Sequence, residues 1–322
     1  MDTKTKILNV LEENKGESVS GSVIARSLGI SRAAVWKAVD ALRKDGHIIE
    51  AGSGRGYILK AESDKLTPEG IRQSLEPDID VVLYDSIDST NKEAKRLAIS
   101  EPERPVLIAA NCQTEGRGRL GRSFYSPADT GLYISFLFKP SFGISKATFT
   151  TAAAAVAVTK AVRTVTGLQC GIKWVNDVYL NDKKICGILT EGITGVETNS
   201  LDYMVVGIGI NCHPADLAPI AGDRAGDLGG GLSRNELIAQ VANELVPLLE
   251  NLDPARFMDY YREHSIVIGE DILITRAGVA SDQPGTRAKA TGISDEGGLI
   301  VAYTDGRKET LTSGEITIRK YQ

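Results

Sequence analysis

The pattern of apolar residues changes twice along the chain, and this constrains the fold more than any other feature. The first 45 residues carry apolar side chains at helical spacing, and the middle of the chain mixes strand-like and helix-like segments. From about residue 268, short strands alternate with glycine-containing turns. At 322 residues the chain is also too long for one average domain. We therefore expect three domains, at residues 1–62, 81–267 and 268–322, with residues 63–80 as a linker.

The first 62 residues are predicted to form a winged helix-turn-helix. Three apolar stripes predict helices at residues 4–13, 20–28 and 32–45. In the second helix Val23 and Ile24 are expected to face inward, and Gly29 ends it. Two short strands, at residues 47–50 and 57–60, are expected to flank a glycine-rich wing. A tight turn between the second and third helices favours a DNA-binding module of this kind.

Charge supports DNA binding by this head. Residues 1–60 hold ten Lys and Arg against seven Asp and Glu, whereas residues 61–322 hold 27 against 35. A basic head on an acidic body suggests that only the head meets a polyanion. The third helix fits the major groove. The expected DNA-contacting residues are Ser31, Arg32, Trp36, Lys37 and, on the wing, Arg55. The alternative is a small helical protein-interaction module.

The body reads as an α+β domain followed by a small β-barrel. Central strands are expected at residues 81–84, 106–110, 132–138, 171–175, 185–190 and 203–210. Helices are expected at residues 91–99, 145–165 and 234–252. Several strands follow one another directly, which favours a mixed sheet with helices on one face. The last five strands, at residues 271–275, 286–293, 299–303, 309–312 and 316–319, predict a barrel of the SH3-like kind.

Composition excludes several classes of protein. No apolar stretch is long enough to span a bilayer, and the first residues lack the apolar segment of a signal peptide. The four cysteines are spread singly, so the sequence predicts neither a disulfide framework nor a zinc site. A cytoplasmic protein without membrane contact is the expectation.

The segment Gly116-Arg117-Gly118-Arg119-Leu120-Gly121-Arg122 is the most informative part of the body. Three glycines and three arginines in seven residues cannot form a core element. Glycine lets the backbone approach a ligand closely, and its amides can form an anion-binding nest. Arginine offers planar, bidentate contacts to phosphate or carboxylate. The segment is therefore predicted to be an anion-binding loop, which we call the Gly/Arg loop.

Three further segments carry polar groups at the ends of elements. Lys173-Trp174-Val175-Asn176-Asp177 ends a strand with oxygen ligands suited to Mg²⁺ or to a ribose, and one lysine of the following hairpin is expected to reach the same cleft. Ser89-Thr90-Asn91 begins a helix with hydrogen-bonding groups suited to a neutral heterocycle. Gly209-Ile210-Asn211 ends a strand whose glycine allows close approach of a ligand. No Walker loop, dinucleotide fingerprint, nucleophile elbow or histidine-based triad accompanies them.

In combination, the winged helix, these four segments and the C-terminal β-domain resemble the bifunctional biotin–protein ligase and biotin operon repressor family over essentially the whole chain. The resemblance implies that biotin and ATP form biotinyl-5′-AMP, with Mg²⁺, and that the acyl group passes to a lysine of a biotin carboxyl carrier domain. It also implies operator binding, biotin-dependent repression of biotin synthesis genes, and a homodimer when the adenylate is bound.

The resemblance also implies roles for single residues. Lys184, Arg119 and Arg117 would be catalytic. Biotin would be held by Ser89, Thr90, Asn91, Gln113, Arg117, Gly118, Arg119 and Lys184. ATP would be held by Arg119, Arg122, Lys173, Asn176, Asp177 and Asn211, with Asp177 as the Mg²⁺ ligand. Lys183 would be the solvated neighbour of Lys184.

The sequence departs from the family pattern in three places. Leu120 stands where many relatives have a further arginine, and Val175 where proline is common. Residues 225–228 break the usual Ala-Thr-Ser-Leu pattern, so the adenine contacts around residues 222–232 stay unassigned. Two alternatives remain open: a transcription regulator that senses a metabolite without turning it over, and a lipoate-type protein ligase.

Overall fold

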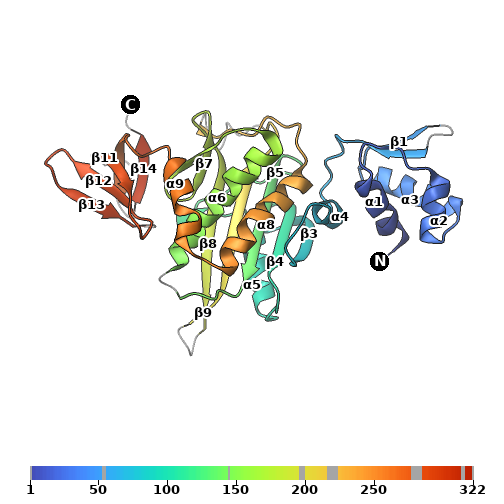
Figure 1. Cartoon of the computed structure of the whole chain (residues 1–322), viewed down its shortest axis with the longest axis horizontal. Helices are drawn as coiled ribbons and strands as arrows, with labels where there is room; N and C mark the ends of the chain where they lie inside the picture. The colour runs from blue at the N-terminus through green and yellow to red at the C-terminus, as the bar shows by residue number, and fades with distance from the viewer. Residues whose placement is uncertain are drawn as a thin grey trace. The chain divides into compact units, whose positions relative to one another are not determined.

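A computed structural model describes residues 2–52, 56–143, 146–195, 200–215, 224–276, 285–312 and 316–320 (Figure 1). The chain divides into two compact units, residues 1–76 with 231–240, and residues 77–230 with 241–322. Helix α8 (Arg234–Glu250) therefore begins in the first unit and ends in the second. The domain boundaries expected from the sequence stay predictions.

The first unit contains the predicted winged helix-turn-helix. Its elements are α1 (Thr3–Glu13), α2 (Gly21–Leu28), α3 (Arg32–Lys44), β1 (Ile49–Gly52) and β2 (Gly56–Leu59). The Ser31 hydroxyl caps α3 by accepting from the Ala34 amide at 3.1 Å. The prediction for Val23 is wrong, because its side chain is 54% exposed while Ile24 is buried. Adjacent helical residues point about 100° apart, and Ile24 takes the inward position.

The segment expected to be a linker is bonded within this same unit. Thr67 caps the short helix α4 (Pro68–Arg72), its hydroxyl accepting from the Gly70 amide at 3.0 Å. The Asp64 carboxylate accepts from both the backbone N–H and the Nε of Arg234, each at 2.7 Å. Asn235 accepts from the Thr67 amide at 3.0 Å and donates to the Lys65 carbonyl at 2.8 Å. Residues 64–70 are therefore tied to the start of α8.

The second unit is built on a mixed seven-stranded sheet of order β3-β4-β5-β9-β8-β7-β6. Only β3 and β4 are parallel, and the remaining pairs are antiparallel. The strands are β3 (Asp80–Ile87), β4 (Val106–Gln113), β5 (Gly131–Phe138), β6 (Gly171–Lys173), β7 (Asp177–Leu180), β8 (Lys183–Thr194) and β9 (Leu201–Asn211). This confirms the predicted α+β class with a mixed central sheet.

Helices cover both faces of this sheet, so the prediction of helices on one face is wrong. Helix α6 (Ala147–Thr166) and the end of α8 lie along one face (Figure 1). Lys160 and Glu244 form an ion pair between these two helices. Helix α5 (Thr90–Ala98) packs on the other face, against β4, β5 and β9. The helix itself was predicted, at residues 91–99, but its buried Ala94 and Ala98 are small and gave no sign that it covers a second face of the sheet.

Register places three glycines together on the α5 face. Gly187 of β8 lies opposite Gly209 of β9, and Gly207 lies opposite both Ser135 of β5 and Leu189 of β8. A Cβ at Gly207 would collide with the Asn91 amide, and one at Gly209 would lie 2.5 Å from the Phe124 ring. The middle of this face therefore lacks large side chains from the sheet itself, which makes room for a cavity and for these two neighbours.

The last strands form an antiparallel sheet of order β13-β12-β11-β10-β14. They are β10 (Asp271–Arg276), β11 (Thr286–Ile293), β12 (Leu299–Tyr303), β13 (Lys308–Leu311) and β14 (Ile316–Lys320). The five predicted strands are confirmed, while closure into a barrel stays a prediction. Among the described residues, no helix combines the length and apolar character that crossing a membrane requires.

Candidate functional site

A cavity of about 590 Å³ opens on the α5 face of the central sheet. The Gly/Arg loop, the start of α5 and the segment after β6 contribute to it, so segments far apart in the sequence meet there. The predicted site residues among its lining are Ser89, Thr90, Asn91, Gln113, Arg117, Gly118, Arg119, Arg122, Lys173, Asn176, Asp177 and Lys184.

One end of the cavity carries neutral hydrogen-bonding groups. The Gln113 side-chain carbonyl accepts from the Thr90 backbone amide at 2.9 Å and lies 3.2 Å from the Thr90 hydroxyl. The Gln113 amide nitrogen donates to the Ser126 hydroxyl at 2.9 Å. Ser89 occupies the N-cap position of α5 without making a capping hydrogen bond from its side chain. This end therefore offers uncharged donors and acceptors, and a site for a neutral heterocycle stays a prediction.

Asn91 is buried at this end of the cavity, and both polar atoms of its side chain bond to the protein. It is 5% exposed, and its Nδ2 donates to Glu191 Oε2 at 2.8 Å. Its Oδ1 lies 2.6 Å from the hydroxyl of Ser135, which is fully buried. Asn91 is thus part of the structure beneath this end of the cavity.

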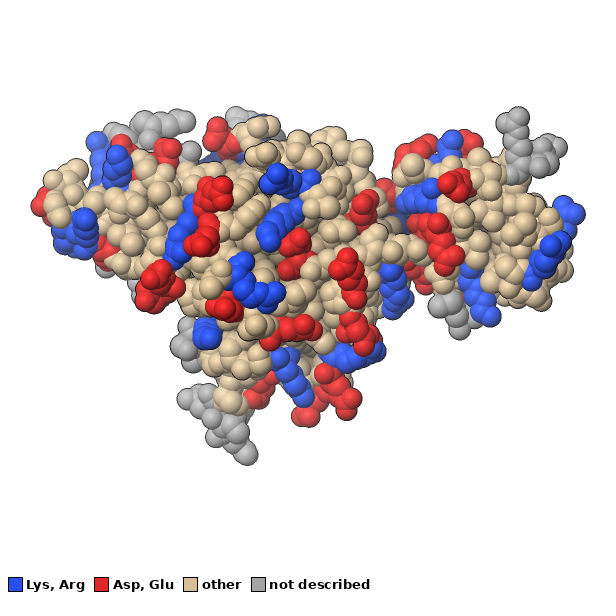
Figure 2. Space-filling model, in the orientation of Figure 1, with Lys and Arg blue, Asp and Glu red and all other residues tan. Residues whose placement is uncertain are grey.

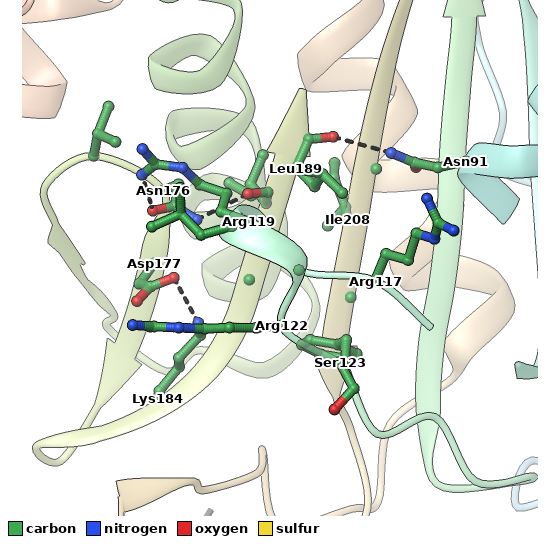
Figure 3. Close-up of a pocket in the computed structure, with 18 of the residues that line it drawn as sticks. Asn91, Arg117, Arg119, Arg122, Ser123, Asn176, Asp177, Lys184, Leu189 and Ile208 are labelled. Carbon is green, nitrogen blue, oxygen red and sulfur yellow. Dashed lines mark hydrogen bonds and ion pairs between the residues drawn. The ribbon is translucent and has the colours of Figure 1, made fainter. Parts of the chain in front are cut away.

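The other end carries charges that are paired within the site (Figure 3). Arg119 Nη1 donates to Asn176 Oδ1 at 2.9 Å, which ties the Gly/Arg loop to the segment after β6. The Lys184 ammonium lies 2.6 Å from Asp177 Oδ1 as an ion pair. Asn176 in turn donates to the Ile188 carbonyl at 2.9 Å. Arg119 and Lys184 are therefore held by the Asn-Asp pair that the sequence singled out.

Burial and neighbouring charges set the ionisation at this end. Burial lowers the pKa of the Arg119 guanidinium, Asp177 raises it, and the like charge of Arg122 lowers it, yet arginine stays protonated at neutral pH. Burial and the Asp177 charge raise the pKa of Tyr179 to about 12, against the opposing effect of Arg224. Tyr179 is therefore a neutral phenol, and the Lys173 ammonium lies 3.4 Å from its oxygen. The charged end is strongly cationic.

The Gly/Arg loop folds back on itself at the cavity wall. The Gly118 amide donates to the Arg122 carbonyl at 2.7 Å. Leu120 adopts a left-handed backbone conformation with φ of 56° and is 59% exposed. The buried Gly116 has no room for a Cβ beside the Phe124 carbonyl. Arg117 points toward the Asn91 end of the cavity in Figure 3.

The segment after β6 is fixed by contacts that the sequence did not reveal. The Trp174 indole N–H donates to the Gly297 carbonyl, in the turn between β11 and β12, at 2.9 Å. The Tyr261 hydroxyl, from helix α9 (Met258–Glu263), donates to the Val175 carbonyl at 3.1 Å. The C-terminal sheet thus supports the charged end of the cavity from behind.

Some predicted residues lie elsewhere. Asn211 does not line the cavity; its amide donates to the Gly226 carbonyl at 2.8 Å and so supports residues 224–228. Lys183 is exposed, as expected for the solvated neighbour of Lys184. In the first unit, Arg32, Trp36 and Lys37 are exposed on α3, while Arg55 falls outside the described residues. Their contacts with DNA stay predictions.

The sequence missed several residues of this region. Tyr179, Phe124 and Arg224 line the cavity, and Glu191 lies beneath it. The signal for Glu191 was a carboxylate directly after an apolar strand, but the predicted strand stopped at residue 190. Arg224 had no signal, because it follows a stretch with no recognisable motif.

Comparison with known proteins agrees with each part of this arrangement. Residues 83–211 match the Biotin/lipoate A/B protein ligase family, residues 3–58 match an HTH domain, and residues 279–319 match the Biotin protein ligase C terminal domain. A solved biotin protein ligase from Aquifex aeolicus, in complex with biotin and ATP, aligns with a TM-score of 0.61 and 26% identity. The alignment covers 75% of this chain and 99% of that one.

Two curated relatives align over nearly the whole chain. The bifunctional ligase/repressor BirA of Bacillus subtilis is 32% identical, over 95% of this chain and 96% of its own length. The protein of the same name from Escherichia coli is 28% identical, over 94% of both chains. A helix-turn-helix head, a ligase domain and a C-terminal β-domain occur here in the same chain, and the protein belongs to the family of bifunctional ligase/repressors named BirA.

Proposed function

We propose that this chain joins biotin to a lysine of a biotin carboxyl carrier domain through biotinyl-5′-AMP. One observation carries the proposal: a single cavity combines a neutral hydrogen-bonding end, at Thr90 and Gln113, with a cationic end, at Arg119 and Lys184. A neutral bicyclic urea with a carboxylate tail presents this same division. Phosphates placed beside the carboxylate would meet the cations.

The proposed roles follow this division. The ring system would contact the groups at the start of α5 and Gln113, while Arg117, Gly118 and Arg119 would close over the carboxylate and phosphates. Lys184 would lie beside the carboxylate that reacts. Arg122, Lys173 and Asn176 would face the nucleotide, and Asn211 would act by holding residues 224–228, since its amide donates to Gly226.

The chemistry requires charge neutralisation above all. A biotin carboxylate oxygen attacks the α-phosphorus of ATP, the bond from that phosphorus to the bridging oxygen breaks, and pyrophosphate leaves. The lysine amine of the carrier then attacks the acyl carbon, AMP leaves, and the amine loses its proton. Lys184 and Arg119 would reduce the repulsion between carboxylate and phosphate and stabilise charge that develops in the first step.

Asp177 fits the proposed Mg²⁺. Its Oδ1 is buried and accepts no hydrogen bond from the described residues, since the nearby Lys184 ammonium forms an ion pair without hydrogen-bond geometry. No cluster of three metal-binding side chains occurs in the described ranges, so Asp177 would be the main protein ligand. Mg²⁺ commonly binds through one or two carboxylates together with phosphate oxygens and water. When bound, it would neutralise phosphate charge.

Mass spectrometry of a carrier domain incubated with this protein, ATP, Mg²⁺ and biotin tests the ligase proposal. The carrier lysine should gain the mass of biotin less one water. No mass gain, although pyrophosphate is released, would restrict the chain to adenylate formation. No pyrophosphate release would favour a sensor without turnover. Competition between biotin and lipoate in the same assay tests the lipoate alternative.

We further propose that the head represses biotin synthesis genes as part of an adenylate-dependent dimer. One winged helix offers few contacts, and a two-fold dimer on a palindromic operator doubles them. The glycine-rich segments 116–122 and 226–231 have compositions suited to ordering around a ligand. If their ordered form builds the dimer surface, the adenylate stabilises the dimer and the DNA complex by linkage.

Sedimentation and operator binding, each with and without biotin plus ATP, test this coupling. A salt series belongs in the operator experiment, because phosphate contacts dominate affinity for DNA. Tighter dimerisation and tighter operator binding with both substrates support the proposal. Equal dimerisation and equal affinity in both states would leave two unconnected activities on one chain.

A further inference from the structure

A chain of hydrogen-bonded side chains runs beneath the neutral end of the cavity. It begins at Glu191 on β8, continues through Asn91 and Ser135, and reaches Thr90 and Gln113. Glu191 does not line the cavity, whereas Thr90 and Gln113 do. Its far carboxylate oxygen accepts from the Lys95 ammonium at 2.7 Å, one helical turn beyond Asn91 on α5.

Glu191 is ionised in this setting. Burial alone raises the pKa of Glu191, but hydrogen bonds from Lys95 and Asn91, together with the positive charges of Lys95 and Arg117, outweigh it and lower the pKa. An ionised carboxylate can only accept hydrogen bonds. Its partner Asn91 must therefore present the NH₂ group to Glu191, and so its carbonyl oxygen to Ser135.

The orientation of the Asn91 amide determines which group donates the proton in the next hydrogen bonds of the chain. Ser135 Oγ lies 2.6 Å from Asn91 Oδ1 and 2.8 Å from Thr90 Oγ1. Serine has one hydroxyl proton and an amide oxygen can only accept, so this proton goes to Asn91. The single Thr90 proton then goes to Ser135 or to Gln113 Oε1. In either case Thr90 Oγ1 accepts from none of these side chains and keeps both of its lone pairs.

We propose that Glu191 is a positioning residue that sets the direction of this hydrogen-bond chain, so that Thr90 Oγ1 accepts from a ring N–H of the ligand without also accepting from Ser135. The inference rests on the proposed function, because it assigns a urea N–H to this end of the cavity. Crowding favours a fixed chain: Ser135 is fully buried, and Gly207 leaves no space for a Cβ beside the Asn91 amide.

Replacement of Glu191 by glutamine should reverse the chain. The Lys95 ammonium requires an oxygen, so the new amide would turn its NH₂ group toward Asn91. Asn91 would then present its carbonyl to residue 191 and its NH₂ group to Ser135. The Ser135 proton would go to one of the two lone pairs of Thr90 Oγ1, which leaves a single, weaker acceptor for the ligand. The backbone carbonyl of Leu189, 3.4 Å from Asn91 Nδ2, favours the present orientation of the Asn91 amide.

The test measures biotin affinity by calorimetry for Glu191→Gln and Glu191→Asp. Glutamine matches the size of glutamate, whereas aspartate keeps the carboxylate. We expect Glu191→Gln to weaken biotin binding about three- to fivefold, because the hydrogen bond to Thr90 is weakened and not lost, and Glu191→Asp to weaken it less. A packing role predicts the opposite order and would overturn the proposal. Glu93→Gln is the matched control, because its carboxylate accepts from Tyr84 and Arg96 instead.

A double-mutant cycle with Thr90→Val separates positioning from general damage. If Glu191 acts through the Thr90 acceptor, Glu191→Gln should change biotin affinity less than about twofold once Thr90 is valine. If the two substitutions instead weaken biotin binding by factors that multiply, the proposal is overturned. Unchanged biotin affinity in Glu191→Gln would overturn it too, as would a rise in the KM for ATP equal to the loss of biotin affinity. A parent protein that binds no biotin would instead refute the proposed function.

Discussion

The two ends of the cavity are built on opposite principles. At the neutral end, Thr90 and Gln113 belong to a chain of hydrogen bonds whose members are mostly buried and whose direction is set by one ionised carboxylate. At the charged end, the cations of Arg119 and Lys184 are held by the partially exposed Asn176 and Asp177.

The difference indicates what each end must do. A fixed chain suits recognition of a ring, because a mismatched ligand leaves buried polar groups without partners. Cations held by single contacts suit a reaction, because they can be released to a carboxylate and a phosphate as these arrive. Figure 2 shows that Lys and Arg elsewhere on the visible surface intermingle with Asp and Glu. A cationic cavity is therefore not a simple consequence of composition.

The largest effect should come from removing the cation beside the reacting carboxylate. Lys184→Ala should slow adenylate formation about 10²–10³-fold, since this is the usual cost of losing one group that stabilises developing charge. Single-turnover release of pyrophosphate measures this step. Lys183→Ala is the matched control, because Lys183 is exposed on the same strand. Near-normal adenylate formation in Lys184→Ala would contradict the division of the cavity into two ends.

The second largest effect should come from breaking the hydrogen bond that ties the Gly/Arg loop to Asn176. Arg119→Gly removes the contact from Arg119 to Asn176, so biotinyl-5′-AMP should leave the site about 10- to 100-fold faster, as expected for one charged hydrogen bond. Labelling of an added amine such as free lysine or bovine albumin detects the escaped intermediate. Arg122→Gly, which gives the loop the same backbone freedom without touching Asn176, should leak less. Equal leakage would mean that backbone freedom matters and the bond does not.

The sequence predicted the charged end better than the neutral end, for physical reasons. Arginine and glycine in alternation, and Asn-Asp after a strand, have no place in a core, so they indicate a site without knowledge of the fold. Glu191 and Ser135 lie on strands, and their role depends on register with β9 and on packing against α5. The sequence does not contain these long-range contacts in a readable form.

The fold shows the same limit. The five strands of the C-terminal sheet and helices α1 to α3 were predicted because their turns and stripes are local. The face of the sheet that α5 covers was not predicted, because the buried stripe of α5 consists mainly of Ala94 and Ala98. The contact of Trp174 with Gly297 joins residues far apart in the chain, and nothing near either residue announces it.

Ionic strength should affect ligand binding at the two ends of the cavity differently, by a smaller factor than the substitutions above. Raising salt from about 0.05 M to about 0.5 M should increase the KM for ATP two- to fivefold, roughly, because exposed charges such as Arg117 and Arg122 become screened. Binding of biotinol, in which an alcohol replaces the carboxylate, should change less than about twofold, because the neutral end offers it no charge. Calorimetry measures the second quantity. An equal dependence on salt for both ligands would show that the ends are not electrically distinct.

The smallest effect should appear in the pH dependence of the free energy of unfolding. The folded-state pKa of Glu191 lies below its usual value near 4.5, so the unfolded chain binds a proton more readily than the folded chain as pH falls. The stability that ionised Glu191 contributes is therefore complete well above pH 4.5 and is lost below it. Glu191→Gln lacks this contribution, and we expect a difference of about 1 kcal/mol or less from the parent at pH 7, as for other partly exposed ion pairs. Urea unfolding of the two proteins between pH 7 and pH 3.5 should show this difference shrinking as pH falls. A difference that stays constant would mean that the carboxylate charge does not hold the neutral end together.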